Sequence, residues 1–456
     1  MARDHAVVIG GSFAGLAAAR ALSDTFEKVT IIDRDDLEAP GNGPRRGVPQ
    51  SAHVHGIRML GRAVMEELMP GFVNETLEQG ARLFDVLSLG ANYTPFGWWA
   101  RGTTQAGGYG IRRVLLESVA RRRILALGNV DFVCGQAAEL LRVGDRIGGV
   151  SVLTDGGTRS LDADLTVDAS GKGSSAPGWL EKAGFTPPDE DIINGYVGYA
   201  SQLVKVPEDA WPGDMQFVSQ LPWPGQTKGA ILYPQDNGLH ILTLFGHSRD
   251  YPPGDEEGYK AFMQGCKVPL FYDLWSKSEP ASGIATSRST ANRMRHYTRL
   301  SDPPAGFIAL GDAVASFNPI FGQGITCSLL GGRLLRDLLT EFDDLAALPK
   351  RFNDDLARML VAPWHTATDF DLSFPETVGP RRTLSTEEQE FANYRLTLAQ
   401  MATVDVSVAE AIQVAEQMFD PALLLVPELQ DKARQFAQRG TPLPVSDPLR
   451  PPAFAA

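Results

Sequence analysis

Two short apolar runs near the start of the chain enclose a segment with helical spacing. Residues 6–9 and 29–32 are rich in β-branched side chains, which favour strands. Between them, within 14–23, apolar residues such as Leu16 and Leu22 recur at the spacing of one helix face. The pattern predicts a strand, helix, strand unit.

The middle of the chain alternates between helical and extended patterns. Helices are predicted over 59–68 and 111–127, and several short strands, separated by Gly-Asp and Asp-Gly turns, over 130–167. Aromatic residues and alternating apolar positions predict antiparallel strands of a separate sheet, in the segments 93–99, 195–204, 229–232 and 240–245.

The last quarter of the chain has mainly helical patterns. Apolar residues from Ile325 to Leu339 follow helical spacing, and 345–439 is predicted to be predominantly helical. Ser385 and Glu388 form a capping-box pattern at the start of one of these helices. The proline-rich segment after this region predicts a disordered tail.

Composition narrows the class of protein. The 456 residues are 43% hydrophobic and 21% charged, which is typical of a globular protein with two or three structural units. A net charge of −13 argues against a nucleic-acid partner, and the absence of a long apolar run argues against a membrane span. The three cysteines have no paired spacing, and a strand that begins by residue 6 leaves no room for a signal peptide. We therefore expect a cytoplasmic protein.

A glycine-rich turn follows the first predicted strand. Gly10 would allow a tight turn, and Gly15 would let the helix pack closely, so that its free N–H groups face a pyrophosphate. Ser12 replaces the middle glycine of the fingerprint, which its small side chain makes tolerable. Asp33 ends the second strand, where an acid is expected at the adenosine ribose. Taken alone, this motif predicts either a dinucleotide site or an ordinary strand-to-helix turn.

A second, distant segment matches the other half of a flavin dinucleotide. Asp312 follows an apolar run and Gly311, so its carboxylate would lie at a strand end and could bind the ribitol of FAD. Gly322 and Gly324 permit close backbone approach, and the helix beginning near Ile325 directs free N–H groups at the preceding loop. Together the two motifs predict bound FAD.

The sequence resembles the FAD-dependent monooxygenases of the para-hydroxybenzoate hydroxylase fold, particularly actinobacterial polyether epoxidases that act on polyketides. The resemblance covers most of residues 1–340, and its most specific runs are 46–55, 287–297 and 310–324. It supports an α/β fold: a Rossmann-like FAD-binding domain (βαβ, with a GxGxxG variant), an inserted mixed or antiparallel β-sheet domain for the substrate, and a C-terminal helical region.

The expected boundaries and site residues follow from the motifs and the resemblance. Arg113 matches the FAD-contacting arginine of the family, although without the resemblance a surface cation is as good an interpretation. The domains are predicted as 1–86, 111–180 and 286–340 for FAD, 87–110 and 181–285 for the substrate, 341–439 for the helical region and 440–456 for the tail. FAD is predicted to be bound by Gly10, Ser12, Phe13, Ala14, Gly15, Asp33, Arg34, Arg46, Arg113, Asp312, Pro319, Gly322, Gly324 and Ile325.

The resemblance implies an epoxidase or hydroxylase that acts through a flavin hydroperoxide. Its substrate would be a bulky, apolar polyketide or terpenoid of secondary metabolism. Because the cofactor would carry the chemistry and the protein would exclude water, no catalytic side chain is predicted. Trp98, Phe317 and Phe321 are expected to line the substrate pocket, although aromatic pairs in strands more often serve packing.

Two departures from the family pattern are present: the first puts direct reduction by NAD(P)H in doubt, and the second removes a possible polar contact near the flavin. Ser170-Gly171 replaces the Asp-Gly of the motif that serves FAD and NAD(P)H, and Ala315 replaces a histidine of many relatives. There is also no second glycine fingerprint for a nicotinamide domain. NAD(P)H and a partner flavin reductase both remain candidate reductants. The departures also leave open a redox-silent FAD-dependent [4+2] cyclase that forms a decalin from a polyene, and, less favoured, a reductase of substrate double bonds.

Two histidines complete the candidates. His53 and His55 alternate as on a strand, yet no third ligand is evident, so no metal site is predicted. A structural role in their loop is favoured. Cys327 is expected to be a small apolar filler in the first turn of its helix.

Overall fold

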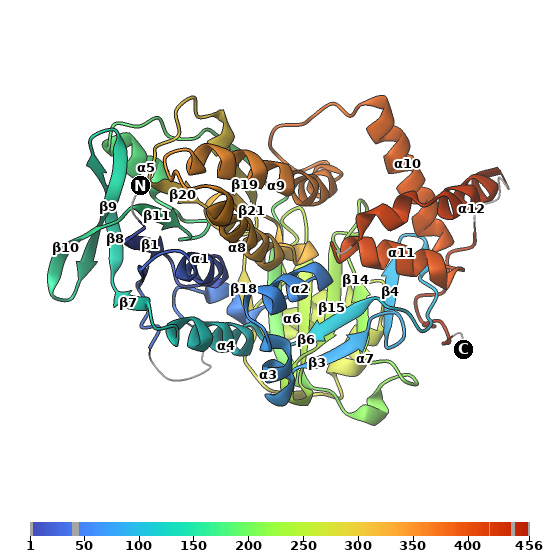
Figure 1. Cartoon of the computed structure of the whole chain (residues 1–456). Helices are drawn as coiled ribbons and strands as arrows, with labels where there is room; N and C mark the ends of the chain where they lie inside the picture. Colours follow the sequence, from blue (N-terminus) through green and yellow to red (C-terminus); the bar gives the residue numbers. More distant parts are fainter. Residues whose placement is uncertain (1–2, 39–44, 419, 439–442, 455–456) are drawn as a thin grey trace.

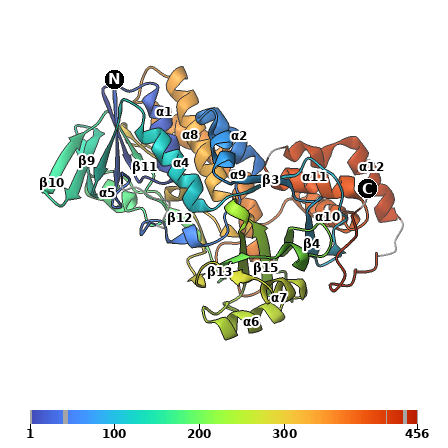
Figure 2. The same cartoon turned by 90° about the horizontal axis from the view of Figure 1, so that it is seen from below.

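The computed structural model describes residues 3–38, 45–418, 420–438 and 443–454. An α/β unit with the N-terminus, a large sheet, and a group of C-terminal helices follow one another across the molecule (Figure 1). Figure 2, turned by 90°, shows the same order, with the C-terminal helices far from strands β8 to β10.

A parallel sheet of order β20-β11-β1-β2-β7 forms the centre of the α/β unit. Its strands are β1 (His5–Ile9), β2 (Lys28–Asp33), β7 (Val130–Cys134), β11 (Leu165–Asp168) and β20 (Phe307–Ala309). Helices pack on one face, and a three-stranded antiparallel sheet covers the other, because β9 contacts β11 and β8 contacts β2. That smaller sheet consists of β8 (Gln136–Val143), β9 (Arg146–Thr154) and β10 (Gly157–Asp162). With both faces covered, the central strands read as continuous apolar runs.

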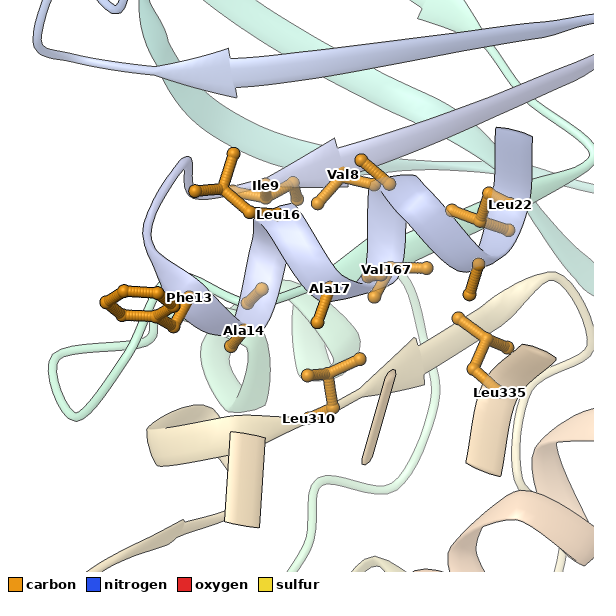
Figure 3. Close-up of a cluster of buried hydrophobic side chains, with 14 of the residues drawn as sticks. Val8, Ile9, Phe13, Ala14, Leu16, Ala17, Leu22, Val167, Leu310 and Leu335 are labelled. Carbon is orange, nitrogen blue, oxygen red and sulfur yellow. The ribbon is translucent and has the colours of Figure 1, made fainter. Parts of the chain in front are cut away.

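The predicted helices of the α/β unit are present, with bounds within two residues of those predicted. They are α1 (Phe13–Ser23), α2 (Met59–Leu68), α4 (Arg113–Leu125) and α8 (Gly324–Glu341), joined by α3 (Phe72–Glu78), α5 (Ala176–Lys182) and α9 (Leu348–Leu372). Helix α1 lies between the parallel sheet and α8 (Figure 3). A Cβ added to Gly332 would lie 2.5 Å from the Cβ of Ala17, so glycine is what allows this approach.

The second large sheet has the order β17-β13-β16-β15-β14-β4-β5, with β18 also paired to β13. The pairs are antiparallel as predicted, except β4 with β14, which is parallel. Its strands are β4 (Gly90–Thr94), β5 (Gly97–Trp98), β13 (Gly198–Lys205), β14 (Phe217–Gln220), β15 (Lys228–Pro234), β16 (His240–Gly246), β17 (Glu279–Pro280) and β18 (Ala285–Ser287). Helices α6 (Glu256–Gln264) and α7 (Leu270–Trp275) pack on β15.

Short strands join the two units. The pair β3 (Arg82–Asp85) and β6 (Gly107–Gly110) is antiparallel, and so are β12 (Glu190–Ile193), β19 (Asn292–Arg295) and β21 (Ala315–Ser316). The last of these leads directly into the loop before α8.

The C-terminal region consists of α10 (Thr386–Met401), α11 (Val406–Glu416) and α12 (Pro427–Gln438). The predicted capping box is present: Ser385 Oγ accepts from the Glu388 N–H, and Glu388 accepts from the Ser385 N–H. Apolar side chains such as Met401 and Val408 share a core with Phe84 and Phe217. No helix among the described residues is both long and apolar enough to cross a membrane.

The tail predicted to be disordered begins outside the described residues, but 443–454 contacts the second sheet. The Trp98 backbone N–H donates to Ser446 Oγ at 2.8 Å, and its indole N–H donates to the Asp447 carbonyl at 3.0 Å. Arg101 donates to the Pro452 carbonyl at 3.4 Å. This part of the tail has no helix, yet it is held against β5.

Candidate functional site

A cavity of about 600 Å³ opens where the parallel strands end. Carboxyl ends of parallel strands meet at one edge of a sheet, which is the usual ligand site of open α/β folds. The turn after β1, the end of β2, the segment after β11 and the loop after β20 all contribute to its wall. Tyr199 of β13, with Thr286, Ser287 and Ser289, lines the other end, so the cavity runs from the parallel sheet to the second sheet.

The turn between β1 and α1 depends on two glycines. Gly10 has φ +105°, and a Cβ there would lie 2.4 Å from the Ala169 carbonyl oxygen. A Cβ on Gly15 would lie 1.7 Å from the Gly10 carbonyl oxygen. Ser12 is the N-cap of α1 but makes no side-chain capping bond; its hydroxyl accepts from Arg113 at 2.8 Å and donates to Glu117 at 3.1 Å. The first-turn N–H groups of α1 therefore have no side-chain cap at the cavity wall.

A charged cluster surrounds the end of β2. Asp33 accepts from the Gly11 N–H at 2.7 Å and the Asp35 N–H at 2.9 Å. Arg45 lies 3.4 Å from Asp33 Oδ1 and donates to Glu117 at 2.8 Å. Arg113 in turn contacts Glu117 at 3.3 Å. The carboxylates and guanidinium groups thus fix one another with little freedom to move.

Asp312 lines the cavity and is partly exposed there, and no described residue donates a hydrogen bond to it. Burial raises the pKa of its carboxyl, while Arg113 and Lys172 act in the opposite direction. Arg113 is 7% exposed and lies over the ring of Phe13 at 4.6 Å; burial lowers its pKa. Lys172 donates to the Ala291 carbonyl at 2.9 Å. The carboxylate therefore faces the cavity with its hydrogen-bonding capacity unused.

The loop before α8 is held from behind by a buried polar network. Asn318 accepts from the Tyr199 hydroxyl at 2.7 Å and donates to Asp371 at 2.8 Å. Asp371, 1% exposed, also accepts from Asn292 at 2.7 Å and lies 3.3 Å from His247 Nε2. Gln323 caps α8 with no side-chain bond, so this helix also presents free N–H groups to the cavity.

Most of the predicted residues are at the cavity. Those that line it are Gly10, Ser12, Phe13, Ala14, Asp33, Arg34, Arg113, Asp312, Phe317, Pro319, Gly322, Gly324 and Ile325. Gly15 does not line it and acts through helix packing. Arg46, predicted to bind FAD, does not line the cavity: Arg45 lines it, whereas Arg46 is exposed in a turn closed by the Val48 N–H and the Arg45 carbonyl.

Two predicted substrate-lining aromatics lie elsewhere. Trp98, 2% exposed, packs edge-on to Tyr93 with centroids 5.0 Å apart and binds the tail, so it belongs to the core of the second sheet. Phe321 packs edge-on against Phe370 of α9, with centroids 5.2 Å apart. Neither ring lines the cavity, because in both cases a residue distant in sequence packs against it.

Sequence reasoning missed several lining residues. Lys172, Tyr199 and Trp179 lie at the cavity, and only Lys172 had a signal, its place directly after the altered Ser170-Gly171 motif. His53 and His55 were noted but not assigned to the site, although both line it. Burial, followed by Arg113, lowers the pKa of His55 to about 3, so its ring is neutral. Among the described residues, no cluster of three or more His, Cys, Asp or Glu could hold a metal ion.

Comparison with known proteins places the chain in a family. No protein-family model matches it. It is 34% identical over 390 residues to Protein Rv3254 of Mycobacterium tuberculosis, which covers 82% of this chain and 81% of that protein. It is also 25% identical to mouse squalene monooxygenase and 24% identical to kynurenine 3-monooxygenase of Salinispora arenicola, covering 74% and 76% of this chain but 55% and 74% of those proteins. The chain belongs to the flavin-dependent monooxygenases. The polyether epoxidase subfamily remains a prediction.

Solved structures confirm the fold predicted for this monooxygenase. The p-nitrophenol 4-monooxygenase PnpA of Pseudomonas putida has a TM-score of 0.63 at 14% identity, over 92% of this chain and 99% of that one. A variant of HpxO of Klebsiella pneumoniae, complexed with FAD, has a TM-score of 0.58 at 17% identity, over 94% and 98%. The Diels-Alderase PyrE3 has a TM-score of 0.59 at 16% identity, over 91% and 81%. At these identities the likeness shows the shared architecture alone.

Proposed function

We propose that FAD lies along the cavity, with its pyrophosphate at the start of α1 and its adenosine ribose at Asp33. Its ribitol would bind Asp312, and its ring would lie before α8. One observation carries this proposal: two helix N-termini without side-chain caps and a half-buried carboxylate without a donor face the same cavity. Each group is costly to leave unsatisfied, and phosphate, a flavin ring and polyol hydroxyls supply what they lack.

Asp33 and Arg45 support the adenosine end of this arrangement. A carboxylate already fixed by two backbone N–H groups keeps lone pairs for ribose hydroxyls, and its charge disfavours a 2′-phosphate. Arg113 reaches the cavity wall beside Ser12, where it would offset the negative charge of the pyrophosphate.

The activity proposed is transfer of one oxygen atom from O₂ to an electron-rich carbon of a bulky apolar substrate. FAD, when bound and reduced, supplies the activation of O₂; two electrons from NAD(P)H or a partner flavin reductase reduce the second oxygen atom to water. The protein would orient the substrate against Phe317 and Tyr199 and exclude water from the closed end of the cavity. A polyketide or terpenoid is the substrate class proposed, in a cytoplasmic secondary pathway; the relative named squalene monooxygenase supports an apolar substrate.

The segment after β11 indicates which reductant is favoured. Asp168 is fully buried and accepts from the Ser170 N–H and hydroxyl and from the Ser174 hydroxyl, so it turns away from the cavity. Ser170 itself lines the cavity. A neutral hydroxyl therefore stands where many relatives carry a charged group, which favours a separate reductase over direct reduction.

A second candidate is a redox-silent cyclase in which bound FAD forms a wall that folds a polyene. The fold shared with the Diels-Alderase PyrE3 and the altered Ser170-Gly171 motif favour keeping it. One assay separates the two functions. The purified yellow protein is incubated with a polyene ketone library under nitrogen without reductant, and then in air with NADPH and a flavin reductase.

Oxygenated products formed only in the second condition support the monooxygenase, and incorporation of ¹⁸O from ¹⁸O₂ into the product identifies the oxygen source. Isomeric products formed under nitrogen would refute oxygen transfer in favour of the cyclase. A protein that is colourless and takes up no FAD would refute both.

A further inference from the structure

The end of the cavity that meets the second sheet contains a histidine held by two buried hydroxyls. His53 lines the cavity beside Tyr199, and the two ring centroids are 6.2 Å apart. His53 Nδ1 lies 2.8 Å from Ser201 Oγ, which lies 2.7 Å from Thr243 Oγ1. Ser201 and Thr243 are 1% and 0% exposed, so water does not reach them.

The hydroxyl protons of Thr243 and Ser201 determine the tautomer of His53. A buried hydroxyl must donate its proton to an acceptor, or it costs free energy. Among the described residues, the one side-chain partner of Thr243 is Ser201, so Thr243 donates to Ser201. Ser201 must then donate its own proton to Nδ1 of His53. Nδ1 is therefore the acceptor, and the ring proton is on Nε2.

Nε2 is left as a donor that faces the cavity. No described residue is its hydrogen-bond partner, and the atom is not fully buried. The nitrogens of an imidazole point in diverging directions, so a ring whose Nδ1 meets the sheet directs Nε2 away from it. Burial lowers the pKa of His53, which keeps the ring neutral. The neighbouring Tyr199 hydroxyl donates to Asn318 and is not available to a ligand.

We propose that the Nε2–H of His53 binds an sp² oxygen of the substrate, such as the carbonyl of a conjugated ketone or amide. This inference rests on the proposed function, and it narrows the substrate to an apolar body that carries one such oxygen. His53 lines the cavity beside Tyr199 of the second sheet, and its loop also approaches the segment before α8, since a Cβ on Gly322 would lie 3.2 Å from the Gly56 carbonyl oxygen. The hydrogen bond would orient the substrate and place the carbons next to its carbonyl at a fixed distance from the flavin ring.

The tautomer can be tested without a substrate. Protein labelled with ¹⁵N-histidine and saturated with FAD is examined by long-range ¹⁵N–¹H correlation, with His53→Gln used to assign the signals. A neutral ring protonated on Nε2 is expected at pH 7.5. A ring protonated on Nδ1, or a charged ring, would overturn the proposal.

Binding of two probes of the same shape tests the ligand class. 2-Acetylnaphthalene carries a carbonyl group where 2-isopropenylnaphthalene carries a carbon–carbon double bond. Binding of each probe is followed by the change in flavin absorbance. The wild-type protein should prefer the ketone about tenfold, as expected for one hydrogen bond made in an enclosed site. His53→Leu should remove that preference and leave the affinity for the alkene within about twofold. Equal affinities in the wild type, or an unchanged preference in His53→Leu, would contradict the inference.

Two serine variants separate positioning from general disturbance of the sheet. Ser201→Ala removes the hydroxyl that fixes His53, and the preference for the ketone should fall by about threefold as the ring loses its orientation. Ser219→Ala removes a hydroxyl of the same sheet that donates to Asn92 and does not contact His53, so the preference should stay unchanged. Equal losses in both variants would argue against a role for Ser201. Failure to bind FAD would refute the proposed function, while the tautomer measured in the same protein would still report on His53.

Discussion

Asp312 shows how one residue can be unfavourable for folding and still be required. Its carboxylate lines the cavity, receives no hydrogen bond from a described residue, and has its pKa raised by burial. A raised pKa in an acid means that the ionised form is destabilised in the folded protein relative to the unfolded chain. Such a group is retained when a ligand satisfies it, and ribitol hydroxyls are donors of the right kind.

We therefore expect Asp312→Ala to lose FAD without losing stability. The dissociation constant for FAD should rise by at least about tenfold, because hydrogen bonds to a charged acceptor are lost. The melting temperature of the apoprotein at pH 7 should be equal or higher. The ratio of absorbance at 450 nm to that at 280 nm after gel filtration, with melts of apoprotein, measures both. Full flavin occupancy in the variant would contradict the ribitol assignment.

His55 predicts a pH dependence with a defined sign. Its pKa falls from 6.5 to about 3 in the folded protein, first through burial and then through Arg113, so protons bind more tightly to the unfolded chain. This histidine therefore favours folding fully above pH 6.5, and its contribution falls as the pH drops toward 3. Between pH 6.5 and 5 the loss should approach about 2 kcal/mol in the free energy of unfolding.

Urea unfolding at several pH values tests this prediction. His55→Gln should lose less stability than the wild type between pH 6.5 and 5, because glutamine does not titrate. Parallel curves for the two proteins would show that His55 is not held neutral by its surroundings.

At the scale of elements, helices α1 and α8 pack closely on each other. A Cβ on Gly332 would lie 2.5 Å from the Cβ of Ala17, whereas one on Gly331 would meet nothing closer than Leu310 at 3.7 Å. Both glycines lie within α8, so both lose helix propensity relative to alanine. They differ in what surrounds them, which makes them a matched pair.

Gly332→Ala should destabilise the protein by about 1–3 kcal/mol, because overpacking outweighs the gain in helix propensity. Gly331→Ala should stabilise it by about 0.5–1 kcal/mol, since its new methyl group meets ordinary contacts. Thermal and urea melts of the two variants test the sign of each change. Destabilisation of similar size in both would show that the contact between the helices is not what requires glycine.

At the scale of the whole molecule, the cavity is built from segments hundreds of residues apart, while the tail lies on another side. The described tail residues contact Trp98 and Arg101 of the second sheet, and neither of these lines the cavity. Removing the chain from residue 443 onward should therefore leave flavin binding intact. It should lower the free energy of unfolding by about 1–3 kcal/mol, as the backbone and indole N–H groups of Trp98 lose their acceptors.

Flavin absorbance and melts of the truncated protein measure the two effects. A conservative control is Ser446→Ala, which removes one acceptor and should cost less than the truncation. Loss of flavin together with the tail would show that the tail supports the cavity.

Local patterns in the sequence determined the parts of this protein that depend on neighbouring residues. The turn at Gly10, the helix at Gly15, the capping box at Ser385 and the strand end at Asp312 were all predictable, because a short segment settles their backbone geometry. Bound FAD was predicted from the combination of two such motifs, and the monooxygenase family from the resemblance of longer runs of sequence.

Tertiary structure alone decided which side chains meet at the cavity. Arg45 rather than Arg46 faces it, and Tyr199 reaches it from a segment without a motif. Trp98, predicted to line the pocket, is covered by the tail instead. The direction in which a loop side chain points, and the contacts between distant segments, depend on the packing of whole sheets and helices. No pattern of neighbouring residues contains that information.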